Sequence, residues 1–315
     1  MARTNGRGRV RFIGLMVVAA VVVVACSPSG GDPAPAATTT PGTMSPPPTA
    51  PPSTLAASST TQAVPVDPTL ERREYLPGLT ATLYLPEATS AAPLVVMVPG
   101  GGWRSADPTG YARLAVHLAE SGMAVLTARI SAADDGAVYP TPIEDIHCAV
   151  GHAIARTEEA GISPDPVILI GHSSGAHLSA LAALTAAEEL PECPDPPRLV
   201  DALIGLAGVY DVTRIPALAF LLFGVAPDDD PELWEEGNPL LRAAMRPQLP
   251  VLLLHGDADQ VVPVSFTSDF ALTLEDGGHN TAVTIIPGAD HNEIYSPEAS
   301  GDLIVDWIER LTEAD

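Results

Sequence analysis

Residues Leu169–His177 read LIGHSSGAH, and this stretch places two adjacent serines, Ser173 and Ser174, between two glycines. The apolar residues before it predict a strand, and the alanine-rich residues after it predict a helix. A Gly-x-Ser-x-Gly pattern between a strand and a helix is typical of a nucleophile elbow, although the serines could also serve only as a helix cap. Only Ser173 has a glycine two positions before it and two positions after it. We therefore expect Ser173 to be a nucleophile and the backbone N–H of Ser174 to face an oxyanion.

Around this stretch, short apolar runs rich in β-branched residues alternate with longer helical patterns. The runs predict strands at residues 80–85, 94–98, 124–129, 167–170, 202–206, 251–254 and 283–286. The helical patterns cover about residues 109–121, 142–160, 175–188, 264–275 and 297–312. This alternation predicts an α/β fold with a mostly parallel central sheet and helices on both faces. Ligands of such sheets bind beyond the carboxyl ends of the strands, so reactive residues should follow strands directly.

Residues 211–241 do not follow the alternation. They contain the apolar segment ALAFLLF at residues 217–223 and an acidic turn at residues 228–230. We expect this segment to be a small cap inserted over the site, where it would supply an apolar pocket wall. An ordinary crossover with a buried helix is the alternative.

A glycine-rich loop follows the strand predicted at residues 94–98. Residues 96–107 read VMVPGGGWRSAD, with three glycines directly before Trp103. Successive glycines let backbone N–H groups come close to a substrate and stabilise a developing negative charge. A plain flexible loop is the alternative, and a phosphate-binding loop is disfavoured because the chain contains no lysine.

Two later loops offer an acid and a base. Residues 251–263 read VLLLHGDADQVVP, in which Asp257 and Asp259 compete for the role of the acid. We favour Asp259, because Asp257 is close enough to Gly256 to be a turn residue. His291 follows the last predicted strand, whereas the other histidines lie on helical patterns, in the elbow, beside the acids or at the opposite sheet edge. The order Ser173, Asp259, His291 is the order of the α/β-hydrolase fold.

Five stretches, PGGGW, YPTPIEDI, GHSSGAHLSALAAL, HGDADQVVP and PGADHNEI, resemble in order and spacing the α/β-hydrolase esterases of the HGGGW type. These include the acetyl-esterase, feruloyl-esterase-like and kynurenine-formamidase-like families. The similarity covers about residues 75–307. It implies an α/β-hydrolase fold, with Ser173 as nucleophile, His291 as base and Asp259 as acid.

The resemblance also implies that the backbone N–H groups of Gly101, Gly102 and Ser174 form the oxyanion hole. One position departs from the pattern, because Pro99 stands where the family has a histidine that braces the glycine loop through its side chain. Proline can only stiffen the backbone. We expect the oxyanion hole to survive this change, while the subfamily and the substrate stay open.

Residues 1–25 have the features of a secretion signal, with four arginines in the first 11 residues and an almost wholly apolar run from residue 12. The run ends in VVAC, which resembles a bacterial lipobox and predicts a lipid on Cys26. Residues 26–66 are mostly Pro, Ala, Ser and Thr, so we expect a disordered tether. The hydrolase domain is then residues 67–315. In an oxidising compartment Cys148 and Cys193 could pair, and the sequence leaves this open.

The chain carries 39 acidic residues and a net charge of −24, which argues against nucleic acid as a partner. Together these features predict a lipid-anchored, extracytoplasmic serine hydrolase that cleaves small-molecule carboxylic esters through an acyl-enzyme on Ser173. The expected mechanism needs neither a metal nor an organic cofactor, and the oligomeric state is open. An amide- or peptide-cleaving hydrolase of the same fold, arylformamidase-like or aminopeptidase-like, is the alternative. A lipid-anchored solute-binding protein is more remote, because it needs no elbow, glycine loop and histidine in this order.

Overall fold

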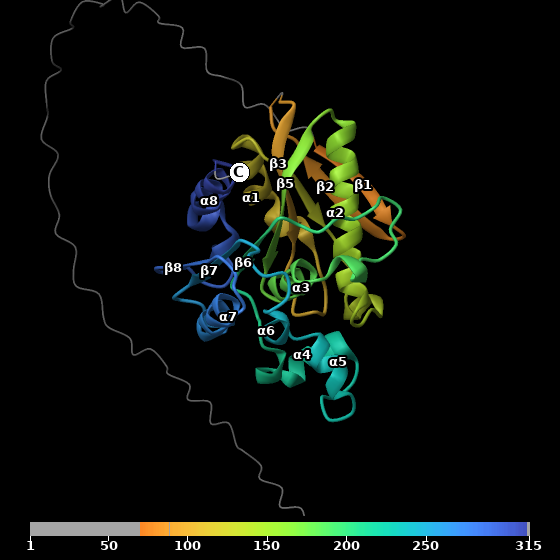
Figure 1. Ribbon diagram of the computed structural model, residues 1–315, viewed down its shortest axis with the longest axis vertical. Coiled ribbons are helices and arrows are strands. Elements are labelled where there is room, and N and C mark those ends of the chain that lie inside the picture. The colour runs from red at the N-terminus through yellow and green to blue at the C-terminus, as the bar shows by residue number, and fades with distance from the viewer. Residues whose placement is uncertain (1–69, 88, 314–315) are drawn as a thin grey trace, which may run out of the picture. The chain divides into compact units, whose positions relative to one another are not determined.

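The computed structural model describes residues 70–87 and 89–313 of the chain (Figure 1). The predicted signal peptide, the predicted lipidation site at Cys26 and the predicted tether up to residue 66 lie outside the described residues. Within the described part, no helix combines the length and the apolar character that crossing a bilayer requires.

Eight strands form a single sheet in the order β1-β2-β4-β3-β5-β6-β7-β8. Strands β1 and β2 form an antiparallel hairpin, β2 is also antiparallel to β4, and all later neighbours are parallel. The sheet is therefore mostly parallel, as the sequence predicts. The strands are β1 Leu70–Leu76, β2 Leu79–Tyr84, β3 Ala91–Val98, β4 Ala124–Ala128, β5 Ser163–His172, β6 Ala202–Leu206, β7 Val251–Gly256 and β8 Thr281–Ile286.

Helices cover both faces of this sheet, because the central strands are apolar on both sides (Figure 1). Along β3, Leu94, Val96 and Val98 belong to one core cluster, while Val95 and Met97 belong to the other. Helices α2, α3 and α7 pack on the first side, and α1 and α8 on the second. Their bounds are α1 Ala112–Glu120, α2 Thr141–Glu159, α3 Ser174–Ala183, α7 Ser265–Asp276 and α8 Asp302–Glu313.

The segment between β6 and β7 forms three short helices, α4 Pro216–Phe223, α5 Pro231–Glu236 and α6 Pro239–Arg242. Figure 1 shows them gathered next to α3. Leu222, Phe223 and Trp234 are buried, whereas Leu218 and Phe220 are exposed by 44% and 47%. The apolar stretch ALAFLLF is therefore a helix with one buried side and one open side, and it is not a fully buried crossover helix.

A disulfide joins Cys148 in α2 to Cys193 in the loop after α3, with 5.3 Å between the two Cα atoms. The sequence left this pairing open. The loop that carries Cys193 returns across α2, and Asp195 in the same loop accepts a hydrogen bond from His152 at 2.9 Å. The bridge therefore fixes a long connection between α3 and β6 to the surface of α2.

Candidate active site

The elbow around Ser173 is a tight turn between β5 and α3. Ser173 has φ 54° and ψ −122°, a conformation that is strained for a residue with a side chain. A Cβ atom on Gly171 would lie 2.4 Å from the Gly175 carbonyl oxygen, and one on Gly175 would lie 2.4 Å from the Pro99 carbonyl oxygen. Glycine is therefore required two positions before and two positions after Ser173, as the Gly-x-Ser-x-Gly pattern predicts.

Ser173, His291 and Asp259 lie in one line of hydrogen bonds. The Ser173 hydroxyl donates to His291 Nε2 at 3.0 Å, and His291 Nδ1–H donates to Asp259 Oδ2 at 2.7 Å. The three residues come from the turn after β5, the loop after β8 and the loop after β7. All three loops leave the carboxyl ends of parallel strands, which is why the fold brings them together.

The carboxylate of Asp259 is fully buried beneath the imidazole. Burial raises the pKa of this carboxyl, but hydrogen bonds from His291 and from the backbone N–H groups of Val262 and Val261 outweigh burial and hold it below its usual value. His255 packs below the same loop, where its Nε2 lies 2.9 Å from the Val262 carbonyl oxygen and 3.2 Å from Asp259 Oδ2. The arrangement keeps Asp259 ionised and orients His291.

The competing acid, Asp257, is exposed, and its Oδ1 accepts the backbone N–H of Gly288 at 2.6 Å. It joins the loop after β7 to the turn after β8, and His291 bonds to Asp259 instead. Of these two carboxylates the sequence favours Asp259, and Asp259 is the one that lies against His291 in the structure.

The glycine loop, residues 100–103, follows β3 and passes beside Ser173. Gly101, Gly102 and Trp103 have φ values of 153°, 61° and 57°. The Gly101 carbonyl accepts the N–H groups of residues 104 and 105, which closes a tight turn. Within the described part of the chain, no acceptor engages the N–H groups of Gly101, Gly102 or Ser174. These groups are free to bind an oxyanion in the pocket.

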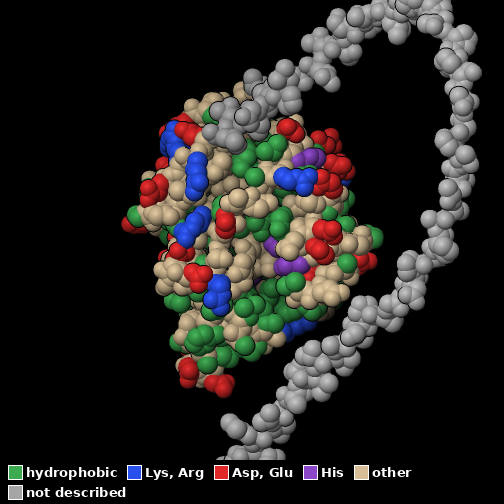
Figure 2. Space-filling view, turned by 180° about the vertical axis from the view of Figure 1, so that it is seen from behind, with side chains coloured by type: hydrophobic (Ala, Val, Ile, Leu, Met, Phe, Trp, Pro, Cys, Tyr) green, Lys and Arg blue, Asp and Glu red, His purple; other side chains and the backbone are tan. Residues whose placement is uncertain are grey.

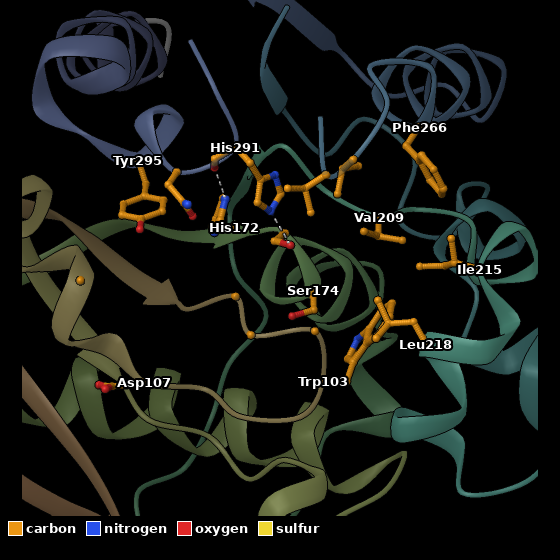
Figure 3. A pocket seen from close by; sticks show the side chains of 18 of the residues that line it. Trp103, Asp107, His172, Ser174, Val209, Ile215, Leu218, Phe266, His291 and Tyr295 are labelled. Carbon is orange, nitrogen blue, oxygen red and sulfur yellow. Dashed lines mark hydrogen bonds between the residues drawn. The ribbon is translucent and has the colours of Figure 1, made fainter. Parts of the chain in front are cut away.

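A pocket of about 410 Å³ opens above Ser173, Ser174, His291 and the glycine loop. In the space-filling view, histidine side chains are visible in the hollow, and hydrophobic side chains gather beside them (Figure 2). The pocket has an apolar side and a more polar side on opposite sides of His291 (Figure 3). The apolar side includes Val209, Ile215, Leu218 and Phe266, and the more polar side includes Asp107 and Tyr295.

No motif in the sequence identifies these residues of the pocket wall. Ile215 and Leu218 come from the segment expected to be a cap, but nothing in the sequence showed which of its apolar side chains face the pocket. The rings of Tyr111 and Tyr295 pack against each other at a tilt, with 4.5 Å between centroids, although the two residues lie 184 positions apart in the sequence. Among the described residues, no group of three or more His, Cys, Asp or Glu is placed to hold a metal ion.

The chain matches a known protein family, several curated protein sequences and many solved structures. The BD-FAE family matches residues 82–274. Esterase LipC of Mycobacterium tuberculosis is 33% identical over 220 residues, which are 64% of this chain and 53% of LipC. Kynurenine formamidase of Drosophila melanogaster is 24% identical over 253 residues, covering 74% of this chain and 78% of that enzyme. The chain spans about half the length of the first curated relatives it matches.

Solved structures with the same fold include a truncated carbohydrate esterase from gut microbiota and esterase Est2 of Thermogutta terrifontis. The first has a TM-score of 0.63 at 21% identity and covers 73% of this chain and 90% of its own. The second has a TM-score of 0.64 at 19% identity and covers 78% of this chain and 94% of its own. At this identity the likeness establishes the fold alone, which is that of the α/β-hydrolases, as the sequence predicts.

Proposed function

Because the chain belongs to the BD-FAE family and has an α/β-hydrolase fold, we propose that it is a serine hydrolase that cleaves carboxylic esters. The observation that carries the proposal is the line of hydrogen bonds from Ser173 through His291 to the buried Asp259, at the floor of a pocket. The matches to curated esterases support ester cleavage in particular.

In the proposed reaction His291 Nε2 removes the hydroxyl proton of Ser173, and Ser173 Oγ attacks the ester carbonyl carbon. The carbonyl oxygen becomes an oxyanion that accepts hydrogen bonds from the N–H groups of Gly101, Gly102 and Ser174. When the intermediate collapses, the C–O bond to the alcohol breaks and His291 gives its proton to the departing alkoxide. Water then attacks the acyl-enzyme by the same route, which releases the carboxylic acid and restores Ser173.

Asp259 contributes by holding the proton of His291 on Nδ1, which leaves Nε2 free to accept the serine proton. Its negative charge also stabilises the imidazolium that forms in each half-reaction. Both effects need an ionised carboxylate, and the hydrogen bonds that lower the pKa of Asp259 provide it.

The pocket supports an uncharged or cationic ester as the substrate. One side of it is apolar, and the chain carries a net charge of −24, which disfavours polyanionic substrates. Amide cleavage is a second candidate, because the match to kynurenine formamidase covers 78% of that enzyme. Hydrolysis of formanilides without hydrolysis of short-chain esters would favour the second candidate.

We also propose that the domain is anchored outside the cytoplasm by a lipid on Cys26. The basic and apolar leader and the VVAC sequence support this proposal, and the disulfide between Cys148 and Cys193 is consistent with an oxidising compartment. Metabolic labelling with tritiated palmitate in a bacterial host should mark the parent chain and leave Cys26→Ser unlabelled. Equal labelling of both would contradict the anchor.

The catalytic proposal is tested by comparing Ser173→Ala with Ser174→Ala on short-chain p-nitrophenyl esters. Ser173→Ala should abolish turnover, because it removes the nucleophile. Ser174→Ala keeps the backbone N–H and should lower kcat far less. Retention of esterase activity by Ser173→Ala, or a larger loss in Ser174→Ala, would refute the assignment.

A further inference from the structure

The elbow carries two histidines, His172 directly before Ser173 and His177 four residues after it, and the proposed reaction uses neither of them. Both side chains are buried. On one side, His177 contacts Trp103 of the glycine loop, and His172 contacts Tyr111, which is bonded to that loop. On the other side, each contacts a backbone carbonyl group of another loop. We infer that His172 and His177 are positioning residues that hold the glycine loop against Ser173. This inference rests on the proposed function, because it concerns the loop whose N–H groups are proposed to bind the oxyanion.

The contacts of His172 belong to a series of hydrogen bonds in which the donor and acceptor of each bond can be assigned. The Gly100 N–H donates to the Tyr111 hydroxyl oxygen at 2.9 Å, and Tyr111 Oη lies 2.8 Å from His172 Nδ1. His172 Nε2 lies 2.8 Å from the backbone carbonyl oxygen of His291. A peptide N–H can only donate and a carbonyl can only accept, so Nε2 carries the proton and Tyr111 donates to Nδ1. These hydrogen bonds therefore connect the glycine loop, the elbow and the loop of the base.

The environment of His172 keeps its ring neutral, which preserves the donor and acceptor roles of its two nitrogens. Burial, and then the neighbouring His291, lower the pKa of His172 to about 3, so the ring is neutral at physiological pH. Burial likewise raises the pKa of Tyr111 well above its usual value. The Tyr295 ring packs against both residues, with centroid distances of 4.5 Å to Tyr111 and 4.7 Å to His172 (Figure 3). Both side chains are fixed by packing as well as by hydrogen bonds.

His177 holds the other end of the glycine loop. The Trp103 indole N–H donates to His177 Nδ1 at 3.3 Å, and the two rings meet edge to face at 5.1 Å. His177 Nε2–H donates to the Gly237 carbonyl oxygen at 2.9 Å, directly after α5. His177 is completely buried, and burial lowers its pKa to about 4. Trp103 is thereby tied to α3 and to the segment between β6 and β7.

The glycine loop needs such support for two reasons. Its Trp103 has a positive φ of 57°, which persists in a non-glycine residue only where the surroundings impose it. Pro99 precedes the loop and has no side-chain donor or acceptor with which to brace it. The elbow is close enough to give this support, because a Cβ atom on Gly100 would lie 2.9 Å from Ser173 Cβ. The two histidines supply the bracing from the elbow side.

The test compares Tyr111→Phe, His172→Leu and His177→Leu with Tyr75→Phe as a matched control. Tyr75 is also buried and donates from its hydroxyl to the Arg129 carbonyl oxygen at 2.7 Å, but it does not line the pocket. The three site variants should lose at least about tenfold in kcat with little change in KM, because the loop donors act mainly on the transition state. Tyr75→Phe should lose stability in urea with kcat unchanged.

Two further measurements separate positioning from general destabilisation. Tyr111→Phe combined with His172→Leu should cost little more than His172→Leu alone, because both interrupt one chain of hydrogen bonds. Independently of turnover, imidazole ¹⁵N shifts at pH 7 should place the proton of both His172 and His177 on Nε2. A proton on Nδ1, a kcat within twofold of the parent in the site variants, or an equal loss in Tyr75→Phe would overturn the inference. If the parent protein itself shows no esterase activity, the proposed function fails, and the ¹⁵N shifts still decide the hydrogen-bond chain.

Discussion

Lowering the pH from 7 to 5 should destabilise the folded domain, because burial lowers the pKa of four histidines, His147, His172, His177 and His255. Burial lowers the pKa of His147 and of His177 to about 4 and that of His172 to about 3. In the unfolded chain each has the ordinary value of about 6.5. Below that pH these histidines bind protons in the unfolded chain but stay neutral in the folded domain. The free energy of unfolding therefore falls as the pH falls. The loss begins near the unfolded pKa and continues down to the folded values.

The size of the effect follows from these values. Each extra proton bound by the unfolded chain lowers stability by about 1.4 kcal/mol per pH unit. Between the unfolded pKa and pH 5 this amounts to about 2 kcal/mol for each histidine, or roughly 6 kcal/mol for His147, His172 and His177 together, and His255 adds to this loss. That is comparable to the whole stability of a small domain, about 5–15 kcal/mol. Carboxylates have ordinary pKa values near 4, so this window reports mainly on the histidines, while Asp145, whose pKa burial raises, acts in the opposite direction.

Urea unfolding followed by tryptophan fluorescence at pH 7, 6 and 5 measures this loss. His147→Leu removes one of these groups, which lies away from the catalytic pocket, so the stability lost between pH 7 and pH 5 should shrink by about 2 kcal/mol. Tyr75→Phe should shift stability without changing the slope, because it removes no group that titrates here. A stability that changes by less than about 1 kcal/mol across the range, or an unchanged slope in His147→Leu, would refute the reasoning.

Other predictions concern the acid, the elbow and the disulfide. Asp259→Asn should lower kcat by roughly 10³- to 10⁴-fold, whereas Asp257→Asn should stay within about threefold of the parent; the reverse result would exchange their roles. Gly175→Ala places a Cβ atom 2.4 Å from a backbone carbonyl oxygen, so kcat should fall by at least about a hundredfold in steady-state assays, and unaltered kinetics would contradict the geometry. Replacing Cys148 and Cys193 by serine opens a loop of 45 residues and should cost about 4 kcal/mol in urea unfolding, with reductant affecting only the parent.

The sequence predicted the central strands well, because strands buried on both faces appear as continuous apolar runs. It missed β1, whose residues LERREYL are mostly charged, since that strand lies at the edge of the sheet and is largely open to solvent. The helix expected at residues 175–188 ends at Ala183, and the polar and acidic residues after it lie in the loop that leads to Cys193. Sequence patterns therefore predicted the elements that have a buried face, and the errors fall in segments that are exposed to solvent.

Some residues of the candidate site could be predicted from the sequence, and others could not. Ser173 and His291 follow directly from motifs beside strands, because a parallel sheet brings its loops to one edge. The choice between Asp257 and Asp259 needed spacing and resemblance, since both carboxylates follow the same strand. The partners of His172 could not be predicted, because Tyr111 and the His291 carbonyl meet it from loops 61 and 119 positions away in the sequence. Contacts of this kind depend on packing that no local pattern contains.

The most direct test of the proposed mechanism is covalent labelling of the nucleophile. A fluorophosphonate probe reacts with a serine only where a base activates its hydroxyl, so the parent protein should gain one probe mass, and peptide mapping should place it on Ser173. Ser173→Ala should remain unlabelled and inactive on p-nitrophenyl acetate. A label on another residue, or an unlabelled parent whose esterase activity survives in Ser173→Ala, would contradict the account.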